Sequence, residues 1–126
     1  MTASAPVIHI VEDDASVLKG LSRLLRAWGY EVCASDGARQ FLDGLDGGPV
    51  ACVIVDVHMP GLTGLQLQSA LNRAGRHIPM VFVTGHGDAS SQREALAEGA
   101  VAFLKKPFTD RELIAAIEQA LSRAPA

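Results

Sequence analysis

The chain has 126 residues, of which 48% are hydrophobic and 20% charged, and its net charge is −3. This size and composition indicate one globular domain that buries a sizeable core, and the acidic balance disfavours non-specific binding to nucleic acid or anionic membranes. No apolar run approaches the length of a membrane span, and the N-terminus lacks a basic region followed by a long apolar one, so we expect a cytoplasmic protein.

Strand-like and helix-like stretches alternate along the chain. Short apolar runs predict five strands, at residues 6–11, 31–34, 51–55, 80–83 and 100–104. Apolar residues at helical spacing predict five helices: within residues 17–28 with Gly29 as the stop, from residue 38 to the glycines at 47 and 48, and at 65–74, 89–98 and from about 110 onward, with Thr109 or Asp110 as N-cap. This alternation predicts a parallel sheet with right-handed crossovers and helices on both faces.

The fourth predicted helix has an unusually small apolar face. Ala95, Leu96 and Ala97 supply most of it. A helix that buries so little apolar surface docks weakly and shifts at low free-energy cost. We therefore expect this helix to be the most easily moved element.

Several residues with reactive or titratable side chains have simple structural interpretations. Cys33 and Cys52 fall inside strand-like runs and lack metal-ligand spacing, so we expect both to be buried, reduced thiols. His9 alternates within the first strand, which is typical of a packed or edge histidine. Asp14 and Asp88 stand where an acid suits the start of a helix.

Polar residues follow four of the predicted strands. The sequences that follow the first, third, fourth and fifth strands are Glu12-Asp13-Asp14, Asp56, Thr84-Gly85 and Lys105-Lys106-Pro107. In open parallel sheets, ligands bind at the carboxyl ends of the strands. The coincidence of polar groups on four separate strands therefore predicts a site at that edge.

These groups suit phosphoryl transfer assisted by magnesium. Mg²⁺ prefers oxygen ligands and keeps several waters, so Asp13 and Asp56 could bind it directly, with the backbone carbonyl of His58 as a third ligand and Glu12 acting through water. Clustered carboxylates repel one another, which should raise the pKa of at least one of them. Asp56 could then act as the nucleophile and form an aspartyl-phosphate, while Lys106 neutralises charge.

Two further residues extend this interpretation. The Thr84 hydroxyl could donate to a phosphoryl oxygen, and Gly85 leaves room for the phosphodonor to approach. His58 and His86 each lie two residues beyond a key residue. We expect their side chains, with Gly85, to tune the rate of phosphoryl loss by flanking the path of water to Asp56, although ordinary loop histidines remain the alternative.

Four segments carry a resemblance to a known family. "HIVEDD", "VIVDVHMPGLTG", "VFVTGHGD" and "FLKKPF" resemble, in order and spacing, the receiver domain of two-component response regulators, and "TGHGD" with "EALAEGAVAFLKKPF" is most similar to the FixJ-like branch. The resemblance implies an α/β fold with a doubly wound, five-stranded parallel sheet, flavodoxin-like, in strand order 2-1-3-4-5.

The same resemblance assigns roles to residues. It implies that Asp56 is the phosphoacceptor, that Glu12 and Asp13 form the acidic pair, and that Lys106 is the active-site lysine. Thr84 would be the switch hydroxyl and Phe103 the aromatic switch residue. A sensor histidine kinase would then phosphorylate Asp56 in an Mg²⁺-dependent reaction.

Phosphorylation would switch the surface formed by the fourth helix, fifth strand and fifth helix, with homodimerisation as a further expected response. We expect no direct nucleic acid or membrane binding by this domain, and no enzymatic activity beyond its own phosphorylation and dephosphorylation. Residues 1–126 are expected to form a single receiver domain without an output domain. Because FixJ-like proteins usually carry a helix-turn-helix output domain, a stand-alone receiver and an excised one both remain open.

Three other functions fit the sequence less well. An aspartate-nucleophile phosphohydrolase would carry a second acid where this chain has His58. A dinucleotide-binding fold is disfavoured because "GHGD" contains only Gly-x-Gly and the acids after the first strand would repel a pyrophosphate. A degenerate receiver that serves only for docking would not need the full set of acids, hydroxyl and lysine.

Overall fold

A computed structural model describes residues 6–45, 50–59, 61–85 and 89–123. The elements alternate as β1 (Val7–Val11), α1 (Ala15–Ala27), β2 (Glu31–Ser35), α2 (Ala38–Asp43), β3 (Cys52–Asp56), α3 (Gly64–Arg73), β4 (Met80–Thr84), α4 (Ala89–Ala97), β5 (Ala102–Lys105) and α5 (Asp110–Arg123). All five predicted strands and all five predicted helices are present. Within these ranges, no helix combines the length and the apolar character needed to cross a bilayer.

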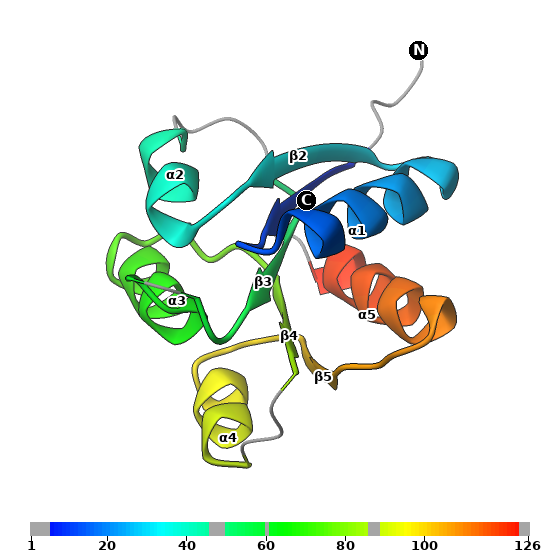
Figure 1. Ribbon diagram of the computed structural model, residues 1–126. Helices are drawn as coiled ribbons and strands as arrows, with labels where there is room; N and C mark the ends of the chain where they lie inside the picture. Colours follow the sequence, from blue (N-terminus) through cyan, green and yellow to red (C-terminus); the bar gives the residue numbers. More distant parts are fainter. Residues whose placement is uncertain (1–5, 46–49, 60, 86–88, 124–126) are drawn as a thin grey trace.

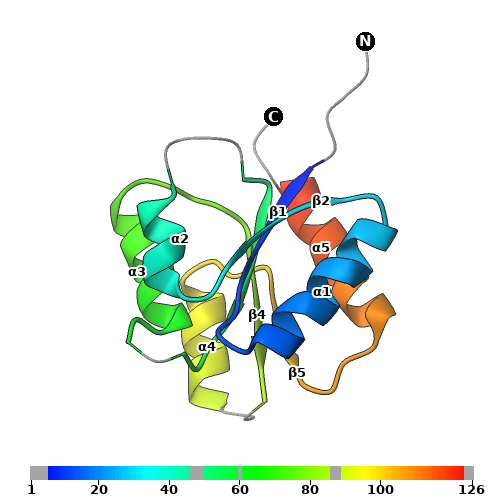
Figure 2. The same cartoon turned by 45° about the horizontal axis from the view of Figure 1, so that its top comes forward.

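The strands form one parallel sheet in the order β2-β1-β3-β4-β5, which confirms the expected topology. Helices α1 and α5 cover one face, and α2, α3 and α4 cover the other (Figures 1 and 2). Each face has its own apolar core: Leu25 and Ile117 belong to the first, and Phe41 and Leu71 to the second. Strands β3 and β4 lie inside the sheet and are buried along their whole length, as their unbroken apolar runs indicate.

Strand β2 lies at an edge of the sheet, and this position makes one prediction wrong. Cys33 is exposed, whereas Cys52 on β3 is buried. A short apolar run does not distinguish an edge strand from an inner one, since both are strands of the same sheet. Burial raises the pKa of the Cys52 thiol to about 12, which makes it an unreactive core residue.

Glycines in the left-handed region end three of the helices. Gly29, Gly75 and Gly99 have φ values of 93°, 74° and 104°. In each case the residue after the glycine donates its backbone N–H to a carbonyl five residues earlier, and the glycine donates to one three residues earlier. This is the Schellman arrangement, and it confirms the predicted stop at Gly29. Helix α2 instead ends at Asp43, before Gly47 and Gly48, which lie outside the described residues.

Side chains cap α1, α3 and α5 at their N-termini, and Thr63 is the N-cap of α3. The Asp14 carboxylate accepts hydrogen bonds from the backbone N–H groups of Ser16 and Val17, which confirms its predicted position at the start of α1. Thr109 and Glu112 exchange side-chain and backbone hydrogen bonds at the start of α5. The prediction for Asp88 falls on a residue outside the described ranges.

The half-buried His9 packs between β2 and α2. Its Nε2 lies 3.2 Å from the Ser35 hydroxyl, and its ring meets Phe41 edge-on at a centroid distance of 4.6 Å. Its Nδ1 is buried and makes no hydrogen bond. Burial lowers the pKa of His9, so the ring is a neutral packing residue, as the sequence indicates.

Candidate functional site

The sheet brings the ends of four strands to one edge. Val11 pairs with Val55, so Glu12, directly after β1, lies beside Asp56, the last residue of β3. Thr84 ends β4 and pairs with Lys105, and its carbonyl accepts a hydrogen bond from the Lys106 backbone N–H at 2.7 Å. The register of the parallel strands therefore places the predicted residues together, although they come from distant parts of the chain.

Glu12, Asp13 and Asp56 form a cluster of carboxylates. One oxygen from each lies within 4.8 Å of the others. The side chains differ in accessibility, because Glu12 is 2% exposed, Asp56 is 7% exposed and Asp13 is open to solvent. The cluster thus has a buried wall and an open side through which a cation or a phosphodonor can enter.

Lys106 supplies the positive charge that faces this cluster. Its Nζ lies 3.2 Å from Oδ2 of Asp56 and 3.3 Å from Oε1 of Glu12. Burial alone would lower the pKa of Lys106, but the two carboxylates outweigh burial and raise it. The ammonium is therefore held charged at neutral pH, where it can neutralise negative charge at the site.

Glu12 has a raised pKa, in agreement with the sequence prediction for at least one of the acids. Burial is the largest cause, and the charge of Asp56 adds to it. The Asp14 backbone N–H, which donates to Glu12 Oε2 at 3.2 Å, and the Lys106 ammonium oppose the rise without cancelling it. The buried position directly after β1, more than repulsion between acids, thus makes the ionised form of Glu12 costly.

The loop after β3 holds the second oxygen of Asp56. The backbone N–H of His58 donates to Asp56 Oδ1 at 2.9 Å. The His58 side chain is exposed. A backbone donor fixes the carboxylate whatever side chain stands at position 58, so any role of the imidazole is separate from this hydrogen bond.

Thr84 is on β4, and Phe103 is on β5, the strand that pairs with β4. Thr84 is fully buried, whereas Gly85 after it is exposed. Phe103 is half-buried on β5 and stacks on the buried Phe82 of β4, at a centroid distance of 6.2 Å and an interplanar angle of 18°. The prediction for His86 falls on a residue outside the described ranges.

Gly64 is a site-supporting residue that we did not single out from the sequence. It opens α3, and a Cβ at this position would lie 2.6 Å from the backbone oxygen of Asp56 and 3.2 Å from Phe82 Cε2. Only a glycine lets α3 approach the end of β3 this closely. A glycine directly after the N-cap Thr63 is unusual in a helix, so the sequence carries a signal at this position. Only the structure shows that the backbone of Asp56 is the neighbour that requires the glycine.

The arrangement fits a hard divalent cation. Its donors are carboxylate oxygens, which Mg²⁺ prefers, and the exposure of Asp13 leaves room for the water ligands that Mg²⁺ retains. The Lys106 ammonium lies against two of the same carboxylates. A nucleophilic carboxylate, further acids and a lysine together suit the transfer of a phosphoryl group.

The sequence of the chain is similar to those of known proteins. Residues 8–118 match the response regulator receiver domain family. The chain is 43% identical to nodulation protein W of Bradyrhizobium diazoefficiens over 117 residues, and 42% identical to the response regulator protein TodT of Pseudomonas putida over 125 residues. It covers 52% and 55% of those two proteins, so it spans about half the length of these curated relatives.

Solved structures show the same fold. The crystal structure of FixJ-N superposes with a TM-score of 0.90 at 34% identity, over 98% of this chain and 99% of that one. Full-length FixJ from B. japonicum gives a TM-score of 0.88 at 40% identity, over 96% of this chain and 60% of the other. The similarity to FixJ in both sequence and structure supports the FixJ-like branch indicated by "TGHGD".

Proposed function

Because the chain belongs to the response regulator receiver domain family of two-component systems, we propose that it accepts a phosphoryl group on Asp56. The observation that carries this proposal is the placement of Asp56, whose two oxygens are held by the His58 backbone N–H and the Lys106 ammonium beside two further acids. The phosphodonor would be the phosphohistidine of a sensor histidine kinase. We expect small phosphodonors to react more slowly.

In this reaction a carboxylate oxygen of Asp56 attacks phosphorus in line with the bond to the donor nitrogen. The P–N bond breaks, the donor imidazole keeps the electron pair, and a P–O bond to Asp56 forms. In this proposal Lys106 neutralises charge on the transferred group, and the Thr84 hydroxyl donates to one of its oxygens. Gly85 leaves the approach to the site open.

Glu12, Asp13 and Asp56 would hold Mg²⁺, with the carbonyl of His58 as a further ligand. The ion would supply neutralisation of the acids and of the incoming phosphoryl oxygens. We propose that Asp13, the exposed member, would be a direct ligand and that the buried Glu12 would act through water.

Phosphorylation is proposed to shift the surface formed by α4, β5 and α5. The described helix α4 buries only Ser91 and Ala95, so little apolar contact resists its displacement. Thr84 would move toward the phosphoryl group and Phe103 would turn into the space it leaves. Such a change is a shift between two packings, biased by contacts that only one of them makes.

The partners proposed are a sensor histidine kinase and, after phosphorylation, a second copy of the domain. We propose that residues 1–126 act as a single receiver domain that binds no nucleic acid itself. The reaction would be confined to the domain's own phosphorylation and dephosphorylation, in the cytoplasm. Whatever output accompanies the domain would respond to the switched surface.

The decisive experiment measures phosphoryl incorporation by intact-protein mass spectrometry with acetyl phosphate and with a phosphorylated histidine kinase. We expect one phosphoryl group per chain in the presence of Mg²⁺, and none with Asp56→Asn or with excess chelator. Asp43→Asn, at an exposed aspartate on α2, is the control and should react like the parent. Incorporation that persists in Asp56→Asn or without divalent cations would refute the proposal.

A further inference from the structure

Helix α4 is held to α3 at its C-terminal end by two side-chain hydrogen bonds. Its buried residues are Ser91 and Ala95, so apolar packing contributes little. At its C-terminal end, by contrast, two side-chain amides of α3 reach across to its backbone. Gln68 Nε2 donates to the carbonyl of Ala95 at 2.9 Å, and Asn72 Nδ2 donates to the carbonyl of Glu98 at 3.1 Å.

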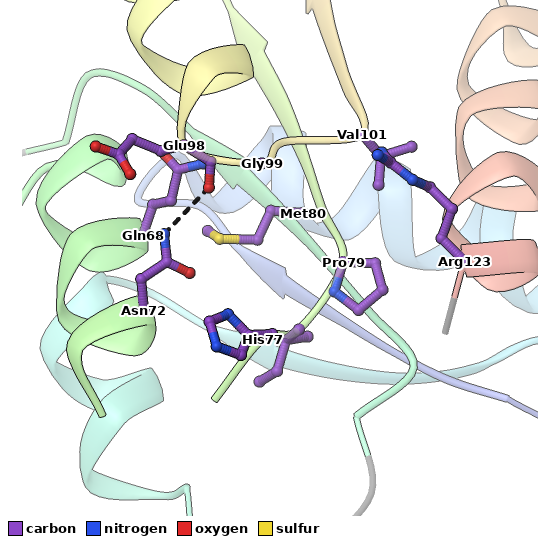
Figure 3. Close-up of a pocket in the computed structure, with 10 residues that line it drawn as sticks. Gln68, Asn72, His77, Pro79, Met80, Glu98, Gly99, Val101 and Arg123 are labelled. Atoms are coloured by element: carbon purple, nitrogen blue, oxygen red, sulfur yellow. Dashed lines mark hydrogen bonds between the residues drawn. The ribbon is translucent and has the colours of Figure 1, made fainter. Parts of the chain in front are cut away.

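These two amides occupy successive turns of one face of α3. Gln68 is 3% exposed and lies in an otherwise apolar part of the helix, beside Leu67 and Leu71. A polar side chain is costly to bury without partners, so its hydrogen bond to α4 is a specific structural feature. Asn72 lies one turn further on, and Figure 3 draws its bond to Glu98 as a dashed line.

Backbone hydrogen bonds also form at the end of α4 that the two amides contact. The Ala95 carbonyl accepts a second hydrogen bond from the Ala100 N–H, and Gly99 donates to Leu96. A pocket of about 240 Å³ lies beside these contacts, lined among others by Gln68, Asn72 and Glu98. The side-chain amides therefore bridge α3 and α4 at the rim of a hollow.

This bridge lies near the N-terminal ends of the strands, whereas Asp56 lies at their C-terminal ends. The chain leaves α4 through Ala100, and the N–H of Val101 donates to the carbonyl of Met80 at the start of β4. The other end of α4 begins at Ala89, five residues after Thr84 at the end of β4. One end of α4 is thus close in sequence to the phosphorylation site, and the other is held by α3.

We propose that Gln68 and Asn72 are positioning residues that make the C-terminal end of α4 a pivot. The bridge persists in both packings of the domain, so phosphorylation displaces the N-terminal part of α4 while its C-terminal end stays in place. This inference rests on the proposed function, because it specifies how the switch described above moves. It assigns the direction of that movement to two side chains outside the phosphorylation site.

The first arm of the test needs no phosphorylation. Hydrogen–deuterium exchange of the α4 amides is compared between the parent, Gln68→Met and Asn72→Ala, with Asn72→Asp as a nearly isosteric variant that lacks the N–H donor. Loss of one hydrogen bond should speed exchange of the amides of residues 95–100 by about fivefold. Ser69→Ala, at an exposed residue between the two on the same helix, should exchange like the parent.

The second arm adds beryllium fluoride and Mg²⁺ as a mimic of the aspartyl-phosphate. In the parent, exchange should change at residues 89–93 and stay constant at 95–100. In Gln68→Met and Asn72→Asp the change should spread to residues 95–100, a pattern that general destabilisation would not produce because it would be present without the mimic.

The outcomes separate the two proposals. If the variants exchange like Ser69→Ala without the mimic, the bridge does not hold α4 and the inference is wrong. If the mimic changes amide exchange equally at both ends of α4 in the parent, the bridge holds α4 but is not a pivot, and the inference is wrong. If the mimic changes nothing at all, the proposed phosphorylation switch fails, and the pivot fails with it, while the first arm still decides whether the bridge exists.

Discussion

The Lys106 ammonium lies 3.2 Å from Oδ2 of Asp56, which is the last residue of the buried strand β3. It also lies 3.3 Å from Oε1 of Glu12, so one cation serves two buried carboxylates. A buried carboxylate without a cation partner is strongly unfavourable. In this state of the domain Lys106 therefore stabilises the fold, in addition to the role in phosphoryl transfer that we propose.

Replacing this lysine should destabilise the protein in a way that Mg²⁺ reverses. Lys106→Met leaves Glu12 and Asp56 without their cation, and we expect the free energy of unfolding to fall by about 1–3 kcal/mol at pH 7. Added Mg²⁺ should restore more stability to this variant than to the parent, because the same carboxylates are the proposed ligands. Urea unfolding with and without MgCl₂, at a concentration of about 10 mM, measures both effects.

The matched control is Lys105→Met, at the exposed neighbour of Lys106. A surface lysine contributes little, so this change should leave stability within about 0.5 kcal/mol of the parent. Equal losses in the two variants, or a loss in Lys106→Met that Mg²⁺ does not reduce, would contradict the assignment of Lys106 as the counter-ion of a metal site.

Glu12 should weaken the fold at neutral pH, although it makes an ion pair. The pKa of Glu12 is raised above its ordinary value of 4.5, first by burial. The folded state therefore binds more protons than the unfolded state between the two pKa values, and stability falls as pH rises through that interval. Glu12→Gln removes this cost, so we expect it to be more stable than the parent above the interval, by on the order of 1 kcal/mol.

Unfolding free energies measured in urea at pH 4.5, 6 and 8, without divalent cations, test this prediction. The gain of Glu12→Gln over the parent should be smallest at pH 4.5 and largest at pH 8. If the variant is instead less stable than the parent at pH 8, the ion pair with Lys106 outweighs the cost of burying the Glu12 charge.

Most of the site could be predicted from the sequence because its residues directly follow strands. Once the strands are parallel, their carboxyl ends must share an edge, so Asp56, Thr84 and Lys106 converge whatever the details of packing. The exposure of Cys33 could not be predicted in this way. An apolar run identifies a strand, but its place at the edge depends on the order of all the strands.

The residues that we did not predict act through tertiary contacts. In the sequence, Gln68 interrupts an apolar face of α3, which is typical of a surface residue. It is buried because α4 covers it, and the Ala95 carbonyl of α4 accepts its hydrogen bond. Gly64 stands at the start of α3, and its constraint comes from the backbone of Asp56. Trp28 fits the apolar spacing of α1 but is 53% exposed. Periodicity indicates the face of a helix and not what packs against it.

His58 provides a test of how the loop after β3 controls the lifetime of the phosphoryl group. The backbone N–H that holds Asp56 is retained in His58→Ala, while the exposed imidazole is lost. We expect dephosphorylation to change severalfold with phosphorylation retained, because we propose that the side chain at this position flanks the water that attacks phosphorus. Mass spectrometry of the phosphorylated protein over time measures the rate, and His77→Ala, at an exposed histidine before β4, is the control. Equal rates in all three proteins would make His58 an ordinary loop residue.

Gly64 allows a prediction about how closely α3 must approach the phosphorylation site. In Gly64→Ala the new Cβ would lie 2.6 Å from the backbone oxygen of Asp56 and 3.2 Å from Phe82 Cε2, so α3 or the end of β3 must shift. We expect a loss of about 1–3 kcal/mol in unfolding free energy and slower phosphorylation of Asp56 by acetyl phosphate. Gly20→Ala is the control, since a Cβ inside α1 meets nothing within 4 Å and should stabilise the protein by about 0.5–1 kcal/mol. If Gly64→Ala behaves like Gly20→Ala in both measurements, the close approach of α3 does not position Asp56.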